Sequence, residues 1–289
     1  MSVLVTEAPA RAREGSGGLD LSRRDLFLWV CAILFFNQML AAVGELQSAS
    51  PWRLLSDLAD SSVFQILAWY AIFRLLAASH SKQPAQISDI LLALALCLPL
   101  FLPTTRTMKV IALGAAMFCW IRGRDDPKLR SAGIVLGALA IQEYWGHIVF
   151  DLFALPLLRA ETAVVGTLVQ AMRAGTVWQG NVITAPSGFS VIVYSACSSF
   201  HNLPLAMLCW VTVSRLRNQS WRNRDLLTAC VIGAAMIACN VARICLMAWS
   251  PDLYEYWHNG PGAQIFAVGA SAMVLALSLY GSRPAERAT

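Results

Sequence analysis

The chain has 289 residues, of which 57% are hydrophobic and only 13% are charged. Charged residues are therefore about half as frequent as in ordinary soluble domains, and the mean hydropathy of +0.57 excludes a soluble globular protein. The net charge of +5 comes from basic residues that lie between apolar segments, where they indicate membrane orientation. Nucleic acid is for that reason not an expected partner.

Apolar stretches of a length that crosses a bilayer follow one another along most of the chain. They begin near Leu26, Ser61, Ile87, Lys109, Leu129, Ser199, Leu226 and Gly262. We predict an all-α polytopic membrane protein with about eight transmembrane helices, and six or seven spans are the alternative because the third and fourth stretches are short. Residues 26–280 are expected to form one transmembrane domain between cytoplasmic tails at 1–25 and 281–289.

Lysines and arginines are distributed unevenly between the two sides of this predicted bundle. Fifteen of them lie in the two tails and in the connections after the second, fourth and sixth stretches, against five in the opposite connections. Because loops on the cytoplasmic side carry the basic excess, we predict a multi-pass protein of the cytoplasmic (inner) membrane with both termini inside. The connections that contain residues 151–196 and 250–261 then face outside.

The longest outside connection, residues 151–196, combines two patterns. From Leu152 to Met172 apolar residues recur at helical spacing with polar residues between them, which favours an amphipathic helix on the outer membrane surface. Residues 176–184 and 189–194 are rich in β-branched and aromatic types and flank Ala-Pro-Ser-Gly, which predicts a short β-hairpin. This hairpin leads directly into Cys197 and the sixth stretch.

Cys197 differs from the other seven cysteines, which lie inside apolar stretches, where cysteine packs as a small hydrophobe. No Cys-x-x-Cys pair occurs, so neither a metal site nor a cofactor is expected. Ser198 or Ser199 suits a helix N-cap, which would place the thiol at a helix N-terminus. The helix dipole there favours the reactive thiolate, and hence a lowered pKa. The alternative is an inert cysteine that packs at the start of a helix.

Arg243 interrupts the seventh apolar stretch about six residues before its outer end, a depth of about 9 Å by helix rise. An arginine at such a depth is expensive to insert and is by default functional, although its side chain can also extend to the membrane surface. Asn240 lies one turn earlier and is expected on the same helix face.

His258 lies in Tyr-Glu-Tyr-Trp-His-Asn-Gly, a predicted outside loop before the last stretch. Alone, it resembles an interfacial histidine among aromatic residues. A Cys–His pair, however, is a common means of activating a thiol and protonating a leaving group. His201, four residues after Cys197, competes for the role of base. Glu143 and His147 form an i,i+4 pair at the outer end of the fifth stretch and are expected to be supporting polar groups of the same site.

Taken together, Ala-Cys-Ser at 196–198, Asn-x-x-Arg at 240–243 and a loop histidine before the final stretch resemble the exosortase/archaeosortase family. The resemblance covers about residues 90–280 and is strongest at 194–200 and 240–244. The family's usual Ala-Cys-Ser-Gly is followed by an aliphatic residue and often Arg. Here Ser199, Phe200 and His201 stand in those places, as in an atypical Ala-Cys-Ser-Ser subfamily.

The resemblance implies a membrane cysteine protease or transpeptidase in which Cys197 is the nucleophile, Arg243 the cation that stabilises negative charge, and His258 the general acid/base. Expected substrates are secreted proteins with a C-terminal signal of a short motif, a transmembrane helix and a basic tail, cleaved at the outer membrane face through a thioester. Membrane lipid is an expected partner, and water, an amine and a lipid-linked sugar are the candidate acceptors.

Two other classes of function stay open at this point. One is a non-enzymatic transporter or assembly subunit in which Arg243 is a binding charge, although the paired repeats of broken helices typical of transporters are not seen. The other is a lipid-linked glycan transferase in which the thiol has no role.

Overall fold

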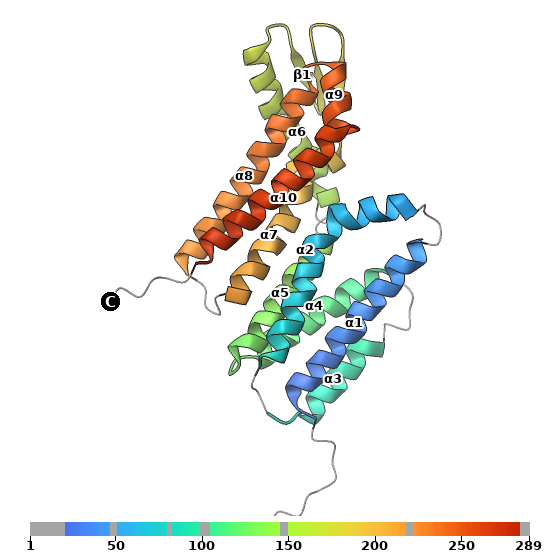
Figure 1. The fold of residues 1–289 in the computed structure, drawn as a ribbon, viewed down its shortest axis with the longest axis vertical. Helices are drawn as coiled ribbons and strands as arrows, with labels where there is room; N and C mark the ends of the chain where they lie inside the picture. Colours follow the sequence, from blue (N-terminus) through green and yellow to red (C-terminus); the bar gives the residue numbers. More distant parts are fainter. Residues whose placement is uncertain are drawn as a thin grey trace, which may run out of the picture.

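Helices make up most of the computed structural model, which describes residues 21–46, 51–79, 83–98, 105–144, 150–217 and 222–283 (Figure 1). The first half contains α1 (Arg23–Leu46), α2 (Pro51–Ala77), α3 (Ile87–Cys97), α4 (Thr105–Arg122) and α5 (Pro127–Tyr144). The second half contains α6 (Phe150–Met172), α7 (Ser199–Arg217), α8 (Asn223–Met247), α9 (Pro251–His258) and α10 (Pro261–Gly281). Each of the eight apolar stretches begins at or inside a helix.

Three helices in the described part of the chain, α6, α8 and α10, are long and apolar enough to cross a membrane by length and composition. Shorter apolar helical segments occupy Val63–Ala77, Ile87–Cys97 and Ile111–Arg122. The predicted class, a largely helical membrane protein, is thus confirmed. The number of spans and the position of the membrane sides remain predictions.

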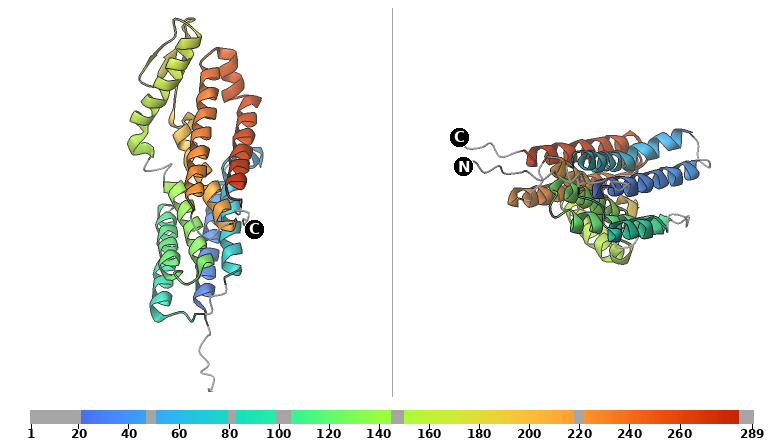
Figure 2. Two further views of the ribbon diagram at one scale, coloured as in Figure 1. Left: turned by 90° about the vertical axis from the view of Figure 1, so that its left-hand side faces the viewer. Right: turned by 90° about the horizontal axis from the view of Figure 1, so that it is seen from below.

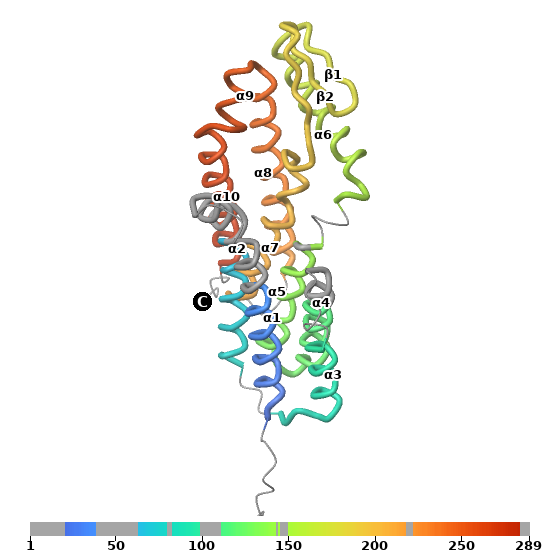
Figure 3. The backbone as a smooth tube through the Cα atoms, turned by 90° about the vertical axis from the view of Figure 1, so that its right-hand side faces the viewer, coloured from blue at the N-terminus to red at the C-terminus, as the bar shows by residue number. Residues whose placement is uncertain are grey.

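Three clusters of buried apolar side chains hold the helices together. The first joins α1 to α5 and includes Leu208 of α7, and the second joins α2, α7, α8 and α10. The third lies between α6, the strands and the C-terminal half of α8. As a result, α1–α5 lie at one end of an elongated molecule and α6–α10 at the other (Figures 2 and 3). Helix α7 packs against α2, α5, α8 and α10 and so connects the two ends.

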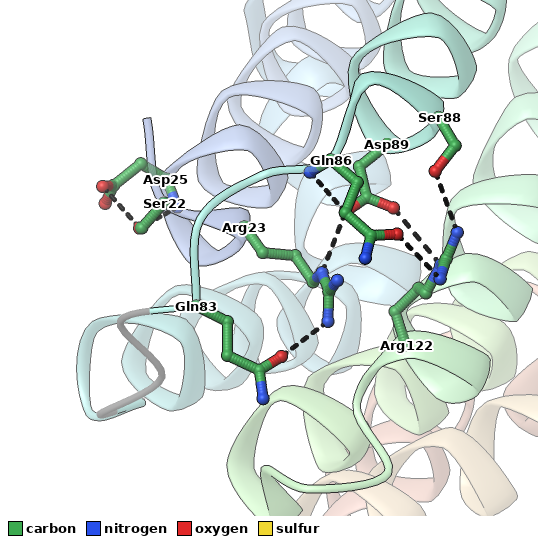
Figure 4. Close-up of polar contacts among 8 residues, drawn as sticks. All are labelled: Ser22, Arg23, Asp25, Gln83, Gln86, Ser88, Asp89 and Arg122. Carbon is green, nitrogen blue, oxygen red and sulfur yellow. Dashed lines mark hydrogen bonds and ion pairs between the residues drawn. The ribbon is translucent and has the colours of Figure 1, made fainter. Parts of the chain in front are cut away.

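A buried ionic cluster fixes one end of the first half (Figure 4). The Asp89 carboxylate, at the start of α3, is fully buried and pairs with Arg23 Nε of α1 at 2.9 Å and Arg122 Nε of α4 at 3.2 Å. Arg23 Nη1 also donates to Gln83 Oε1 at 2.7 Å. Breaking such a buried pair leaves an uncompensated charge that costs about 3–5 kcal/mol. The cluster joins two arginines that the charge pattern assigns to the same membrane side.

The segment before Cys197 forms a three-stranded antiparallel sheet in the order β1 (Val177–Gln179), β2 (Val182–Thr184) and β3 (Ser190–Ile192). The prediction of a two-stranded hairpin was therefore incomplete, because residues 176–184 fold as two strands and not one. Gln179 pairs with Val182 across a two-residue loop that begins with Gly180, whose φ is +62°. Glycine at the first loop position is a recognised hairpin signal.

Helix α6 presents one face to the sheet and to α8. Leu158, Glu161, Thr162, Val165 and Val169 are buried at helical spacing, and the other side of the helix exposes apolar side chains such as Phe153 and Val164. The predicted helix is present, but its two faces differ from the expectation, because the polar residues Glu161 and Thr162 lie on the buried face while apolar side chains are exposed. Since α6 also qualifies as a span by length and composition, its place on the outer membrane surface remains a prediction.

Candidate active site

Cys197 lies in a tight turn between the sheet and α7. After β3, Val193 N–H donates to Asn181 O at 2.8 Å, and residues Ser195–Cys197 form a single 3₁₀ turn closed by Cys197 N–H to Tyr194 O at 2.9 Å. Ser198 is extended and its Oγ accepts from Phe200 N–H at 3.3 Å, so it is the N-cap of α7. The thiol is thus carried by the turn before the helix and not by the first turn of α7.

His258 is the last residue of the short helix α9, and not part of a loop as predicted. Helix α9 begins at Pro251, after the N-cap Ser250, whose Oγ accepts from Leu253 N–H at 3.2 Å. A serine N-cap and a proline at the first helical position are both favoured at a helix start. The helix ends before Gly260 and Pro261 begin α10. Its position brings His258 Nε2 to 3.6 Å from Cys197 Sγ.

The other side of the His258 ring is held by its own helix. His258 Nδ1 lies 2.8 Å from Asn259 Oδ1, and Asn259 Nδ2 donates to Glu255 Oε2 at 2.8 Å. Because Asn259 presents its oxygen to the ring, Nδ1 carries the proton and Nε2 is left as an acceptor facing the thiol. Tyr254 stacks on the imidazole with ring centroids 4.8 Å apart. This arrangement suits a general base.

Arg243, near the end of α8, is bonded to the last turn of helix α9, which carries His258. Its Nε and Nη2 both donate to Trp257 O, at 3.1 and 2.9 Å. The guanidinium also lies over the Phe266 ring of α10 at 4.8 Å. The half-buried side chain and its two hydrogen bonds to one carbonyl argue against an arginine that merely extends to the membrane surface. A cavity of about 280 Å³ beside it, between α2, α7, α8 and α10, has mainly apolar walls that include Phe64, Leu205 and Met236.

The electrostatic setting of the thiol contradicts the expected lowered pKa. Burial of the thiol raises the pKa of Cys197 above its ordinary value, Arg243 and the Tyr194 backbone oppose this, and Glu161 adds to it. The expectation relied on the helix N-terminus, whereas Cys197 lies just before the N-cap Ser198, in the 3₁₀ turn, and is half-buried. The thiol is consequently protonated at rest and requires a base.

Asn240 and Glu161 support the segment around Cys197. Asn240 Nδ2 donates to Cys197 O at 2.7 Å and to Glu161 Oε1 at 3.2 Å. Asn240 was expected to be a supporting residue, but it contacts the cysteine backbone and not Arg243. Glu161 was not among the residues expected in the site. The available signal was a carboxylate in the middle of a 23-residue helix with long apolar stretches on either side, a position where a charge requires partners.

The remaining expected residues have different outcomes. His201 is on the first turn of α7 with an exposed side chain, and its ring lies edge-on to Phe150 at 5.9 Å. Of the two histidines, only His258 has a recorded contact with the thiol. The Glu143 side chain and all of His147 lie outside the described residues. Within the described ranges, no group of three or more His, Cys, Asp or Glu side chains is arranged to hold a metal ion.

These features define a helical membrane protein with a cysteine and a histidine in contact beside an arginine. Residues 39–275 match the model of the transmembrane exosortase family, and the chain therefore belongs to that family. Its members are generally cysteine transpeptidases that act on secreted proteins. The matched range contains Cys197, Arg243 and His258. Neither a curated protein nor a solved structure matches the chain.

Proposed function

We propose that this protein is a membrane cysteine protease or transpeptidase that cleaves the C-terminal sorting signals of secreted proteins. The observation that carries the proposal is the 3.6 Å contact between Cys197 Sγ and His258 Nε2, in a chain of the exosortase family. No feature of the described residues favours a transporter or a glycan transferase over this function.

In the first half of the reaction, His258 Nε2 accepts the Cys197 proton as sulfur attacks the carbonyl carbon of the scissile peptide bond. General-base activation is required because the thiol is protonated at rest. Negative charge then develops on the carbonyl oxygen, and Arg243, whose Nη1 has no recorded protein partner among the described residues, is the cation available to stabilise it. His258 returns the proton to the leaving amine, which leaves an acyl thioester on Cys197.

In the second half, His258 deprotonates the acceptor, which attacks the thioester carbonyl and releases the thiol. Water as acceptor gives hydrolysis, while an amine or a lipid-linked hydroxyl gives transpeptidation or anchoring. The substrate signal is a short motif followed by a transmembrane helix and a basic tail. The site faces the outside of the cytoplasmic membrane, as the basic residues of the opposite loops suggest.

A reporter experiment tests this function. A secreted protein that carries the host's own C-terminal signal is expressed with each variant and scored for loss of its anchoring helix. We expect no cleavage with Cys197→Ser or His258→Ala and most of the wild-type cleavage with His201→Ala. Full cleavage by Cys197→Ser would rule out the enzymatic function, and loss in His201→Ala but not in His258→Ala would move the base to α7.

A labelling experiment tests the orientation independently. A membrane-impermeant thiol reagent applied to intact cells should modify Cys197, and a cysteine introduced as Arg217→Cys should react only after the membrane is opened. The reverse order of accessibility would overturn the predicted topology.

A further inference from the structure

We propose that Glu161 of α6 is a positioning residue that fixes the Cys197 turn against α7 and α8. This inference rests on the proposed function, because it concerns how the nucleophile is held for that reaction. No element of the sequence motif includes Glu161, which lies 36 residues before Cys197.

The Glu161 carboxylate is buried, with 4% of the residue exposed, and receives bonds from three residues. Ser198 Oγ donates to Oε2 at 2.6 Å, and Ser199 N–H donates to Oε1 at 2.9 Å. Oε1 also accepts from the Ser199 hydroxyl and from Asn240 Nδ2. All four groups are donors, as an acceptor-only ionised carboxylate requires. The buried charge is therefore compensated by hydrogen bonds at both of its oxygens.

These bonds fix the cysteine from two directions. The Ser198 and Ser199 contacts hold the residues directly after Cys197, and Asn240 holds the Cys197 carbonyl at 2.7 Å while it also contacts Glu161. Neither carboxylate oxygen has a recorded contact with Cys197 Sγ or with His258. Glu161 thus acts through the backbone of the turn, and removing it should displace the thiol from His258 Nε2.

The same carboxylate accounts for the departure from the usual Ala-Cys-Ser-Gly pattern. Glycine at position 199 would supply the backbone N–H to Glu161 Oε1 but not the hydroxyl. Ser199, which is fully buried, supplies both. The serine therefore adds one charge-assisted hydrogen bond to the set that joins Glu161 to Ser198, Ser199 and Asn240, which we call the clamp. Such a contact is stronger than one between neutral groups.

The test compares Glu161→Ala and Glu161→Gln with Thr162→Val, each purified as the full chain in lipid nanodiscs. Thr162 is the matched control, since it is buried on the same helix and its hydroxyl has no recorded partner among the described residues. A displacement of about 1 Å can reduce turnover about 100-fold. We expect Glu161→Ala to lower kcat about 100-fold with KM unchanged, and Thr162→Val to keep kcat within about threefold. Equal kcat values for the two variants would overturn the proposal, as would a rise in KM at constant kcat.

A second readout needs no substrate. Glu161→Gln keeps the shape of the side chain, and its amide oxygen can still accept the Ser199 and Asn240 donors, but the negative charge is lost. The rate of Cys197 alkylation should then reach its inflection at lower pH than in the wild type, and Thr162→Val should leave the inflection in place. An unchanged inflection in Glu161→Gln would contradict a Glu161 charge that acts on the thiol across the turn.

The two readouts separate this inference from the proposed function. If the wild type cleaves no reporter but Glu161→Ala, unlike Thr162→Val, changes the alkylation rate of the fully ionised Cys197 thiolate at high pH, the function fails while the positioning role of Glu161 stands. If the wild type cleaves and Glu161→Ala matches it, the clamp fails and the function stands. Thermal unfolding of each variant identifies any that do not fold, and in that case Glu161→Gln and Ser199→Gly, which removes only the hydroxyl contact, carry the test.

Discussion

Replacing Arg243 with lysine should be nearly as damaging as replacing it with alanine. The guanidinium uses Nε and Nη2 on one acceptor, Trp257 O, at 3.1 and 2.9 Å, and keeps Nη1 for the developing oxyanion. A lysine ammonium is a compact charge that cannot reproduce this fork. A lysine at position 243 can donate a hydrogen bond to Trp257 O, in the last turn of α9, or to the oxyanion, but its single ammonium group cannot reach both.

The expected fall in kcat of Arg243→Lys depends on which contact the lysine loses. Removing one donor to a developing oxyanion costs about 2.7–4 kcal/mol, or about 10²–10³ in kcat. If the lysine instead serves the oxyanion, the turn loses a charged hydrogen bond worth about 1.5–3 kcal/mol, and His258 moves from the thiol. We expect kcat to fall by about 10²–10³ in the first case and by about 10- to 100-fold in the second, measured as reporter cleavage by purified protein in nanodiscs.

Arg173 provides the matched control for this substitution. It also donates to a backbone carbonyl near a helix end, Trp249 O, and lies over the Trp249 ring at 5.6 Å, but it has no contact with the Cys197–His258 pair. Arg173→Lys should therefore keep kcat within about threefold. An Arg243→Lys protein with near wild-type turnover, beside an inactive Arg243→Ala, would show that charge alone suffices and would refute the argument from geometry.

Two further predictions concern the histidine turn and the thiol. Gly262→Ala should reduce turnover. A Cβ at Gly262 would lie 2.8 Å from Tyr256 O and 2.7 Å from the Tyr256 ring, so α9 and His258 would be pushed away from α10. Unchanged cleavage by a folded variant would contradict this. The pH profile of Cys197 alkylation should have its inflection above the free-thiol value of about 8.5, because burial raises the pKa of Cys197 more than Arg243 lowers it. The thiolate fraction is then small at neutral pH and grows as pH rises. An inflection on the acid side of that value would show an ion pair already formed between Cys197 and His258 and would contradict a thiol that is protonated at neutral pH.

Much of the helical framework follows from composition and periodicity. Long apolar runs have few alternatives to helices in a membrane, and each predicted stretch falls in a helix. The sheet was predicted less well, because a two-residue turn at Gly180 was read as the middle of a strand. In a run rich in β-branched residues, a single glycine is a weak signal unless its φ is known.

Some residues of the candidate site could likewise be predicted from the sequence, and others could not. Cys197, Arg243 and His258 could be proposed from the sequence because each is an unusual residue in its local setting, and the family pattern joins them; their catalytic roles stay a prediction. Glu161, Glu255 and Asn259 were not found, since their roles depend on contacts between elements far apart in sequence or on the orientation of one amide. The pKa expectation for Cys197 failed for a related reason. Burial and the charge of Glu161 are tertiary properties, whereas the helix dipole is a local one.

The most direct test of the central claim is to look for a covalent bond between Cys197 and the substrate. Purified protein is mixed with the reporter in nanodiscs, quenched in acid, digested and analysed by mass spectrometry. We predict a thioester between Cys197 and the carboxyl end of the reporter fragment that precedes the cleavage point. It should accumulate when the acceptor is withheld, and it should be absent from Cys197→Ala. Cleavage of the reporter by Cys197→Ala, or turnover by the wild type with an acyl group trapped on another residue, would contradict Cys197 as the nucleophile.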